Sequence, residues 1–289
     1  MILLAYYIAT VNIETTYSSL RNSGKYVPFE GISYTDTLRL NPLYRLEKHH
    51  RQETTSLDDT FVIAHQRISN QRGAHVHVIV GNPPYSKGQS SFSDNNPNIE
   101  YPEIDKRIKN TYMTKAKTHD KKSLYDSYVR SLRWASDRIG ESGIVAFITN
   151  ASFISTATAS GIRACFEEEF NDIWCFNLRG NGRLTGDGRS IFEYPGRSAG
   201  GTRTPVAIII LVKNPEKKAH LIHYHSIEEK YYSGPDKRNR VKELGSIKGI
   251  KNWEIIQSDK NYDWINKISI FPYINRIFRL TNELSCIIS

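Results

Sequence analysis

The sequence predicts a wound α/β sheet, a fold class in which helices cover a mostly parallel sheet. Segments with the patterns of helices and strands alternate along most of the 289 residues, as this class requires. The strand-like segments are short and rich in β-branched residues, which is typical of strands buried on both faces. Hydrophobic residues make up 39% of the chain and charged residues 24%, an ordinary globular composition that can support one large core or two smaller ones.

The expected elements follow one another along the chain. Helices are expected over the first fifteen residues, over residues 123–138 and over about residues 160–170. Strands are expected at residues 75–80, 144–149, 173–177 and 206–212. Residues 213–218 read as a turn between strands, and residues 233–242 as a charged surface loop.

Two polar segments interrupt these elements. Residues 86–122 are rich in serine and asparagine and then strongly basic, and a long polar insertion after a strand is usually a mobile lid or a disordered loop. Its lysines and arginine, together with Tyr101 and Tyr112, could contact nucleic-acid phosphates and bases, or the segment could be a solvated basic loop. Residues 180–203 are glycine-rich, but their spacing does not match a dinucleotide-binding turn, so a flexible loop is expected.

Composition and residue counts narrow the classes of function. The net charge of +9 favours a polyanionic partner. The three cysteines are too few and too scattered for a disulfide framework or a zinc site, which fits a reducing cytoplasm. His220, His223 and His225 lack an accompanying carboxylate pattern, so no metal site is expected. The apolar opening of the chain lacks a basic n-region and reads as a buried helix rather than a signal peptide.

The most informative motif is Asn82-Pro83-Pro84-Tyr85. It follows an apolar strand directly, and ligand sites in open α/β sheets gather at the carboxyl ends of such strands. The Asn82 side-chain carbonyl and the Pro83 carbonyl can accept the two hydrogens of a planar amino group and so favour a tetrahedral, nucleophilic nitrogen. The two prolines stiffen the loop, and Tyr85 offers a flat face for a flipped base. The alternative is a chance proline turn after a strand.

Residues 81–86 resemble the catalytic loop of amino-group methyltransferases that use S-adenosyl-L-methionine, including adenine-specific DNA methyltransferases. The resemblance covers most of residues 1–265 and points to the Type ISP restriction-modification proteins. The segments that carry it are Met1 to Asn12, Asp36 to Leu38, Leu124 to Arg130, Gly143 to Asn150, Asn177 to Asn181, Arg203 to Ile208 and Asp263 to Asn266.

The resemblance implies a fold, a reaction and site residues. The fold is a Rossmann-like methyltransferase sheet, and the reaction transfers the sulfonium methyl group to the N6 amine of a flipped adenine in double-stranded DNA. Asn82 and Pro83 would orient the amine within the catalytic loop, which includes Pro84, and Tyr85 would stack on the base. Asp36 would contact the cofactor adenine. Phe192 or Tyr194 is the candidate for a second stacking ring, unless it is an ordinary loop aromatic.

The chain departs from these proteins at both ends. Their glycine turn for the cofactor and the acidic residue for its ribose would lie before Met1. We therefore expect an N-terminally incomplete sheet, with a partial catalytic domain over residues 1–265 and a divergent tail over residues 266–289. We expect the chain to be inactive alone and to belong with the nuclease, helicase and target-recognition regions of a longer parent polypeptide.

Two alternatives to an active DNA methyltransferase stay open. A related enzyme class uses the same loop to methylate an RNA base or a glutamine amide in a protein, because the loop recognises a planar amino group. The second alternative is an inactive remnant that keeps a nucleic-acid surface but does not hold the cofactor. The matches after residue 123 and the basic balance favour DNA.

Overall fold

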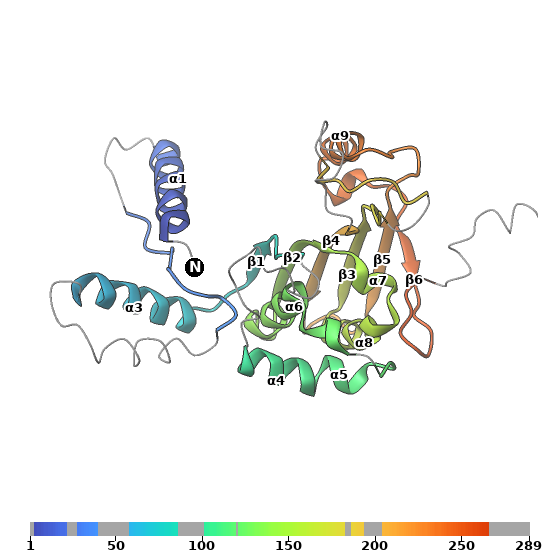
Figure 1. Ribbon diagram of the computed structural model, residues 1–289, viewed down its shortest axis with the longest axis horizontal. Helices are drawn as coiled ribbons and strands as arrows, with labels where there is room; N and C mark the ends of the chain where they lie inside the picture. Colours follow the sequence, from blue (N-terminus) through green and yellow to red (C-terminus); the bar gives the residue numbers. More distant parts are fainter. Residues whose placement is uncertain are drawn as a thin grey trace, which may run out of the picture. The chain divides into compact units, whose positions relative to one another are not determined.

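The computed structural model describes residues 3–21, 28–39, 58–85, 101–119, 121–182, 186–193 and 204–265 (Figure 1). Contacts divide the chain into two compact units. The first comprises Met1–Val76 and Tyr101–Ile104, and the second comprises His77–Glu100 and Asp105–Ser289. The expected tail over residues 266–289 and residues 86–100 lie outside the described residues.

The described residues of the first unit include two helices and a non-helical segment, residues 28–39, between them in the sequence. Helix α1 spans Leu3–Arg21 and helix α3 spans Asp58–Gly73, so a helix at the start of the chain is confirmed and is longer than predicted. The expectation that this helix is buried is wrong, because its apolar side chains lie mostly on the surface, with Leu4 65% and Val11 60% exposed. The buried Glu14 carboxylate accepts a hydrogen bond from the Phe29 backbone N–H at 2.9 Å. This bond ties α1 to the segment that follows it, and the Arg72 guanidinium ties α3 to the Arg39 carbonyl at 2.9 Å.

The second unit is built on a sheet of six strands. The strands are β1 (Val78–Gly81), β2 (Gly143–Asn150), β3 (Asp172–Asn177), β4 (Val206–Lys213), β5 (Leu221–Ser226) and β6 (Glu254–Ile256). Their order in the sheet is β1-β2-β4-β3-β5-β6. Strands β1 and β2 are parallel, as are β3 and β5, whereas β4 runs antiparallel to both of its neighbours and β6 antiparallel to β5. The four predicted strands are therefore confirmed, each shifted at its ends by a few residues at most.

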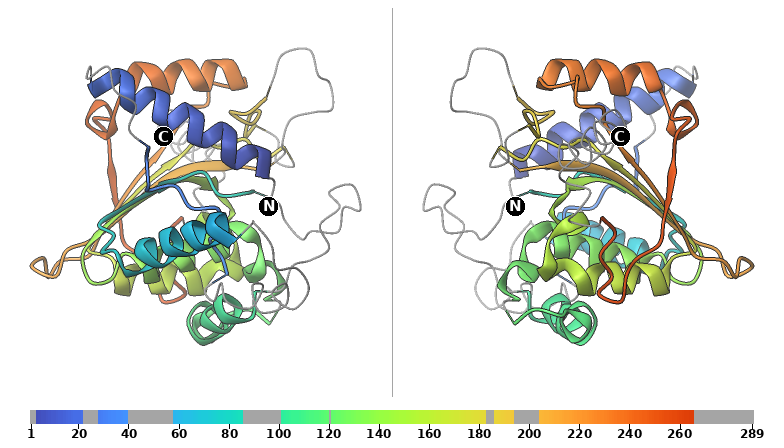
Figure 2. Two further views of the ribbon diagram at one scale, coloured as in Figure 1. Left: turned by 90° about the vertical axis from the view of Figure 1, so that its left-hand side faces the viewer. Right: turned by 90° about the vertical axis from the view of Figure 1, so that its right-hand side faces the viewer.

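Helices cover one face of this sheet much more completely than the other. The helices α6 (Ser127–Arg138) and α8 (Ser160–Glu169) lie against one face, and the short α7 (Ser152–Ser155) precedes α8 (Figure 2). Val145, Ile209 and Leu211 are fully buried on that face. On the opposite face Val78 is 58% exposed and Val80 is 77% exposed, because the helix α9 (Gly234–Leu244) packs over β3 and β4 and not over β1.

The basic part of the 86–122 segment is helical, so the expectation of a lid or disordered loop is wrong for residues 101–119. They form α4 (Pro102–Asn110) and α5 (Tyr112–Lys115), and a 3₁₀ turn, η2 (Lys122–Tyr125), leads into α6. Ile104, Ile108 and Tyr112 are all fully buried. Their spacing of four residues is a helical core pattern that the surrounding charges obscure in the sequence.

Residues 233–242 are also helical, which corrects the prediction of a charged surface loop. The segment forms α9, and the Ser233 side chain caps its start by accepting a hydrogen bond from the Asp236 backbone N–H at 3.2 Å. Pro235 occupies the first turn, where its missing N–H costs nothing. A serine cap followed by proline is a helix-start signal, but the many charges favoured a loop prediction.

Within the described residues, no helix is long and apolar enough to cross a membrane. Short 3₁₀ turns, η3 (Ala157–Ala159) and η4 (Ile247–Gly249), connect the remaining elements. The segment after β6 closes against α8, where the buried Arg163 guanidinium donates to the Phe153 carbonyl at 2.8 Å and pairs with Asp263 at 2.5 Å. The segment from β6 to residue 265 thus belongs to the fold of the second unit.

Candidate active site at the end of β1

The predicted catalytic loop lies at the carboxyl end of β1, as the sequence pattern requires. Gly81 is the last strand residue and pairs with Phe147 of β2. A side chain at Gly81 would begin 3.0 Å from the Phe147 ring, so a larger residue here would push the ring by a few tenths of an ångström. Pro83 is buried, whereas Asn82 and Pro84 are exposed. The buried proline anchors the loop and leaves the Asn82 side chain accessible to a substrate.

The Tyr85 hydroxyl fixes the orientation of the Asn82 side chain. Its single hydrogen is shared between two acceptors, the Asn82 side-chain oxygen and the Ile148 carbonyl, which is 2.9 Å away near the end of β2. Burial raises the pKa of Tyr85 to about 12, so the hydroxyl stays protonated and remains a donor at neutral pH. The Asn82 oxygen has a second lone pair, so it can accept a substrate hydrogen while Tyr85 holds it.

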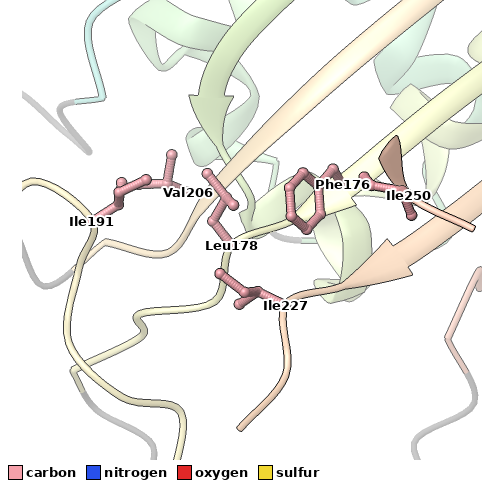
Figure 3. Packing of buried hydrophobic residues seen from close by; sticks show 6 residues of the cluster. All are labelled: Phe176, Leu178, Ile191, Val206, Ile227 and Ile250. Atoms are coloured by element: carbon pink, nitrogen blue, oxygen red, sulfur yellow. The ribbon is translucent and has the colours of Figure 1, made fainter. Parts of the chain in front are cut away.

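The structure brings Phe192 to Tyr85, although the two residues are far apart in the sequence. The ring centroids are 5.5 Å apart and the ring planes are tilted by 46°. Both rings pack against a buried cluster of Phe176, Leu178, Ile191, Val206, Ile227 and Ile250 (Figure 3). The two predicted stacking residues therefore lie in one place beside Asn82. The other candidate, Tyr194, lies outside the described residues.

The described part of the glycine-rich segment is held by backbone hydrogen bonds, so the flexible loop expected there does not describe these residues. The Gly180 N–H donates to the Asp187 carbonyl at 3.1 Å, and the Arg189 N–H donates to the Tyr232 carbonyl at 2.8 Å. Gly180 adopts a φ of 94° with Ser190 backbone atoms where a side chain would lie. These bonds fix the path of the chain that carries Phe192.

A polar residue at the end of β2 was missed by reasoning from the sequence. Asn150 is fully buried, and its side-chain oxygen accepts a hydrogen bond from the Ser152 N–H at 2.8 Å. Its side-chain nitrogen has no partner among the described residues. Because β1 and β2 are parallel neighbours, their carboxyl ends share one edge, so this buried donor lies at the same edge of the sheet as the loop after β1. The polar ending of an apolar strand was the available signal.

Asp36, the predicted contact of the cofactor, belongs to the first unit. One oxygen of its carboxylate accepts from the Leu38 N–H at 3.2 Å, and the other accepts from the Tyr101 hydroxyl at 3.1 Å. The side chain is about one-third exposed. This turn holds the carboxylate in a defined orientation, while its role toward a cofactor stays a prediction.

Several cations of the basic segment are paired within the fold. The Arg107 guanidinium binds the Asp137 carboxylate through contacts of 2.7 and 2.9 Å, and Lys115 forms an ion pair with Glu168. The Lys121 ammonium donates to the Met113 carbonyl at 2.5 Å. These pairs favour a structural role for these three cations over contacts with phosphates.

The histidines of β5 pack within the sheet. His223 stacks on Trp174 with ring centroids 3.6 Å apart, and the His225 ring nitrogen lies 3.1 Å from the Asn252 carbonyl. Within the described ranges, no group of histidine, cysteine and acidic residues could hold a metal ion. An apolar cavity of about 180 Å³ lies beside Trp174 under α9, away from the loop after β1.

Comparison with known proteins identifies relatives of the chain. A protein-family model described as Eco57I restriction-modification methylase matches residues 12–178. Among proteins of curated function, none matches the chain. The chain is similar to a nuclease-deletion mutant of the Type ISP restriction-modification enzyme LlaGI, solved with a DNA substrate mimic, at 41% identity and a TM-score of 0.77.

Two further solved structures are similar over the same extent. The ATP-dependent Type ISP restriction-modification enzyme LlaBIII bound to DNA shares 34% identity with a TM-score of 0.76, and the DrdV–DNA complex shares 33% identity with a TM-score of 0.74. Each of the three matches covers 92% of this chain. The chain in turn spans 21%, 17% and 24% of the LlaGI, LlaBIII and DrdV chains. The predicted Rossmann-like sheet is confirmed by these superpositions.

Proposed function

The chain belongs to the Eco57I restriction-modification methylase family, and from this premise we propose that, within a longer parent polypeptide and not alone, it transfers the methyl group of S-adenosyl-L-methionine to the N6 amine of adenine in double-stranded DNA. The observation that carries the proposal is the exposed Asn82 carbonyl, held by Tyr85 at the end of β1 with the Phe192 ring beside it. A planar amino group needs hydrogen-bond acceptors, and a flipped base needs rings, and this site offers both.

The residues of the loop would activate the amine by position. The Asn82 oxygen and the Pro83 carbonyl accept its two hydrogens, which concentrates the nitrogen lone pair toward the methyl donor. S-adenosyl-L-methionine supplies an electrophilic sulfonium methyl group. With that cofactor bound, the amine nitrogen would form the new bond to the methyl carbon, the electron pair of the broken carbon–sulfur bond would stay on sulfur, and the proton of the nitrogen would leave to solvent. Since the proton leaves after attack, no dedicated general base is needed.

Two other groups are proposed to serve the cofactor. Asp36, oriented by Leu38 and Tyr101, would accept from the amino group of the cofactor adenine. The unpartnered amide nitrogen of Asn150 fits a polar ligand at the carboxyl edge of the sheet, since a buried donor without a partner is costly.

The proposal favours DNA over the alternative substrates. The LlaGI and LlaBIII structures contain a DNA substrate mimic and DNA, and this chain carries a net charge of +9. The same loop would also suit an RNA base or a glutamine amide, and an inactive remnant would retain only nucleic-acid binding. The nuclease, helicase and target-recognition regions implied by the resemblance are the proposed partners within a longer parent polypeptide.

The test is a tritiated-methyl transfer assay on the protein as expressed from its own gene. Double-stranded DNA, RNA and a glutamine-containing protein are offered in separate reactions with labelled S-adenosyl-L-methionine. We expect label in DNA only, and enzymatic digestion of that DNA should return N6-methyladenine. Label in RNA or protein instead would replace the substrate. Label in none of them, with retained DNA binding, would support the inactive remnant.

A further inference from the structure

Phe192 is carried by a tight turn. The Glu193 N–H donates to the Ser190 carbonyl at 3.0 Å, which closes a four-residue turn with Ile191 and Phe192 at its centre. The Ile191 side chain is buried in the cluster of Figure 3, and the Phe192 ring contacts Tyr85. Because one central residue is anchored in the core and the next faces the site, the position of this turn sets the position of the Phe192 ring.

Helix α9, which is distant from this turn in the sequence, forms hydrogen bonds with it. One terminal nitrogen of the Arg238 guanidinium donates to the Ile191 carbonyl and, at 3.0 Å, to the Glu193 carbonyl. These two carbonyls flank Phe192 on either side. Charge-assisted hydrogen bonds of this kind are stronger than neutral ones, and a guanidinium has a fixed planar geometry that positions its acceptors.

A second contact brings α9 against the same turn. A side chain at Gly234 would begin 2.7 Å from the Ser190 carbonyl oxygen and 3.0 Å from that of Glu193. Both neighbours are backbone atoms, so glycine is what allows the helix start to approach. The turn is thus anchored in two ways. The Ile191 side chain fixes it in the buried cluster, and α9 fixes it through the hydrogen bonds of Arg238 and the close packing at Gly234.

We propose that Arg238 is a positioning residue that places the Phe192 ring opposite Tyr85, so that α9 builds one wall of the base-binding site. This inference rests on the proposed function, in which the two rings support a flipped base. Methyl transfer requires reacting atoms to be held within a fraction of an ångström, and a displaced wall lowers the rate even when the loop after β1 is intact. DNA affinity should change little, because contacts with phosphates supply most of it.

Four variants test the inference, and they separate the effect of the Arg238 hydrogen bonds on the turn from any effect on the stability of α9. Arg238→Met removes both hydrogen bonds to the turn, and Arg238→Lys keeps the charge without the planar guanidinium. Gly234→Ala adds a side chain that displaces the turn. Arg240→Met is the matched control, because Arg240 lies in the same helix but binds Glu228 and Glu243. A thermal melt of each variant establishes that it is folded.

The first measurement is independent of activity. A fluorinated phenylalanine at position 192 of the full chain gives a ¹⁹F resonance that senses the neighbouring Tyr85 ring. We expect Arg238→Met and Gly234→Ala to move this resonance toward the solvent-exposed value, Arg238→Lys to move it part of the way, and Arg240→Met to leave it unchanged. An unmoved resonance in folded Arg238→Met would contradict the claim that Arg238 positions the turn. If Arg238→Met does not fold, an unmoved resonance in folded Arg238→Lys and Gly234→Ala overturns it instead.

The second measurement is methyl transfer to DNA by the protein as expressed from its own gene. We expect Arg238→Met to lower kcat about tenfold with a nearly unchanged KM for DNA, Arg238→Lys to recover part of that loss, and Arg240→Met to match the wild type. Equal rates for Arg238→Met and Arg240→Met would overturn the positioning role. A wild-type protein that transfers no methyl group to any substrate overturns the proposed function, and the ¹⁹F resonance then decides separately whether Arg238 holds the turn.

Discussion

At the scale of single residues, Tyr85 has two separable roles in the proposed site. Its ring packs beside Phe192, and its hydroxyl orients the Asn82 oxygen while also contacting the Ile148 carbonyl. The stacking role was expected from the sequence, because a flat ring follows the amine-binding residues. The orienting role was not, because it depends on Ile148 of another strand.

Substitutions at Tyr85 should separate these roles. Tyr85→Phe keeps the ring and loses the one hydroxyl hydrogen that Asn82 and Ile148 share, worth about 0.5–1.5 kcal/mol, so methyl transfer should fall roughly twofold to tenfold. Tyr85→Ala also loses base stacking of about 1–3 kcal/mol, and transfer should fall by a further tenfold or more. Single-turnover methylation of DNA measures both. If the two variants were equally damaged, stacking would be the wrong role for the ring.

Lys237 gives a second residue-level prediction. It is almost fully buried in α9, and its ammonium approaches the Asp187 carbonyl only at 3.5 Å. Burial lowers the pKa of Lys237 to about 8. The unfolded chain therefore binds more protons than the folded one between pH 8 and the usual lysine pKa, so this group destabilises the fold below pH 8 and ceases to do so as the pH rises.

Removing the Lys237 charge should therefore stabilise the chain against unfolding by an amount that depends on pH. Lys237→Met should stabilise the chain at pH 7 by on the order of 1–3 kcal/mol, because one pKa unit corresponds to about 1.4 kcal/mol. The gain should shrink toward zero at pH 10 to 11. Urea unfolding of both proteins at the two pH values tests this. A loss of stability at pH 7 would mean that the ammonium is well paired in the folded state.

At the scale of elements, four of the six strands were predicted from the sequence, whereas several helices, α4 and α9 among them, were not. The runs of β2 and β4 are mostly apolar and rich in β-branched residues, so their burial dictates a strand whatever the partner. Helices α4 and α9 are dominated by charge, so their signals, four-residue isoleucine spacing and a serine cap, were outweighed. The position of β4 between β2 and β3 was not predictable, because strand pairing depends on contacts far apart in the sequence.

The same limit applies to the candidate site. The loop from Asn82 to Tyr85 was readable because its chemistry is contained in four consecutive residues. The pairing of Phe192 with Tyr85 was expected only from the resemblance, and the contact with Arg238 was not expected at all. That contact joins residues 47 and 45 positions apart, and each is an ordinary loop or surface residue in the sequence.

At the scale of the whole molecule, the sheet exposes apolar side chains on one face. Val78 and Val80 of β1 project there, and Ile144 and Ile148 of β2 are 38% and 37% exposed on the same face. Ile79, between the two valines, points to the opposite face and is 9% exposed. This contrast within one strand predicts a difference in how substitutions act.

We expect Val78→Thr with Val80→Thr to change the free energy of unfolding by less than about 1 kcal/mol, because exposed strand positions tolerate threonine. The double variant should also bind less of an apolar fluorescent dye and aggregate less. Ile79→Ala should cost about 2–5 kcal/mol through cavity formation. Urea unfolding and dye binding measure these effects. Equal costs on the two faces would show that the valine face is covered in solution.

The central claim is that Asn82 activates an amino group for methyl transfer, and one comparison tests it most directly. Asn82→Ala and the wild type, each in the protein as expressed from its own gene, are assayed for tritiated-methyl transfer from S-adenosyl-L-methionine to double-stranded DNA, with cofactor affinity measured alongside. Losing one amine acceptor should lower the rate about a hundredfold or more, by analogy with the loss of an oxyanion-hole donor, while cofactor affinity barely changes. Equal transfer rates for the two proteins would contradict this role of Asn82.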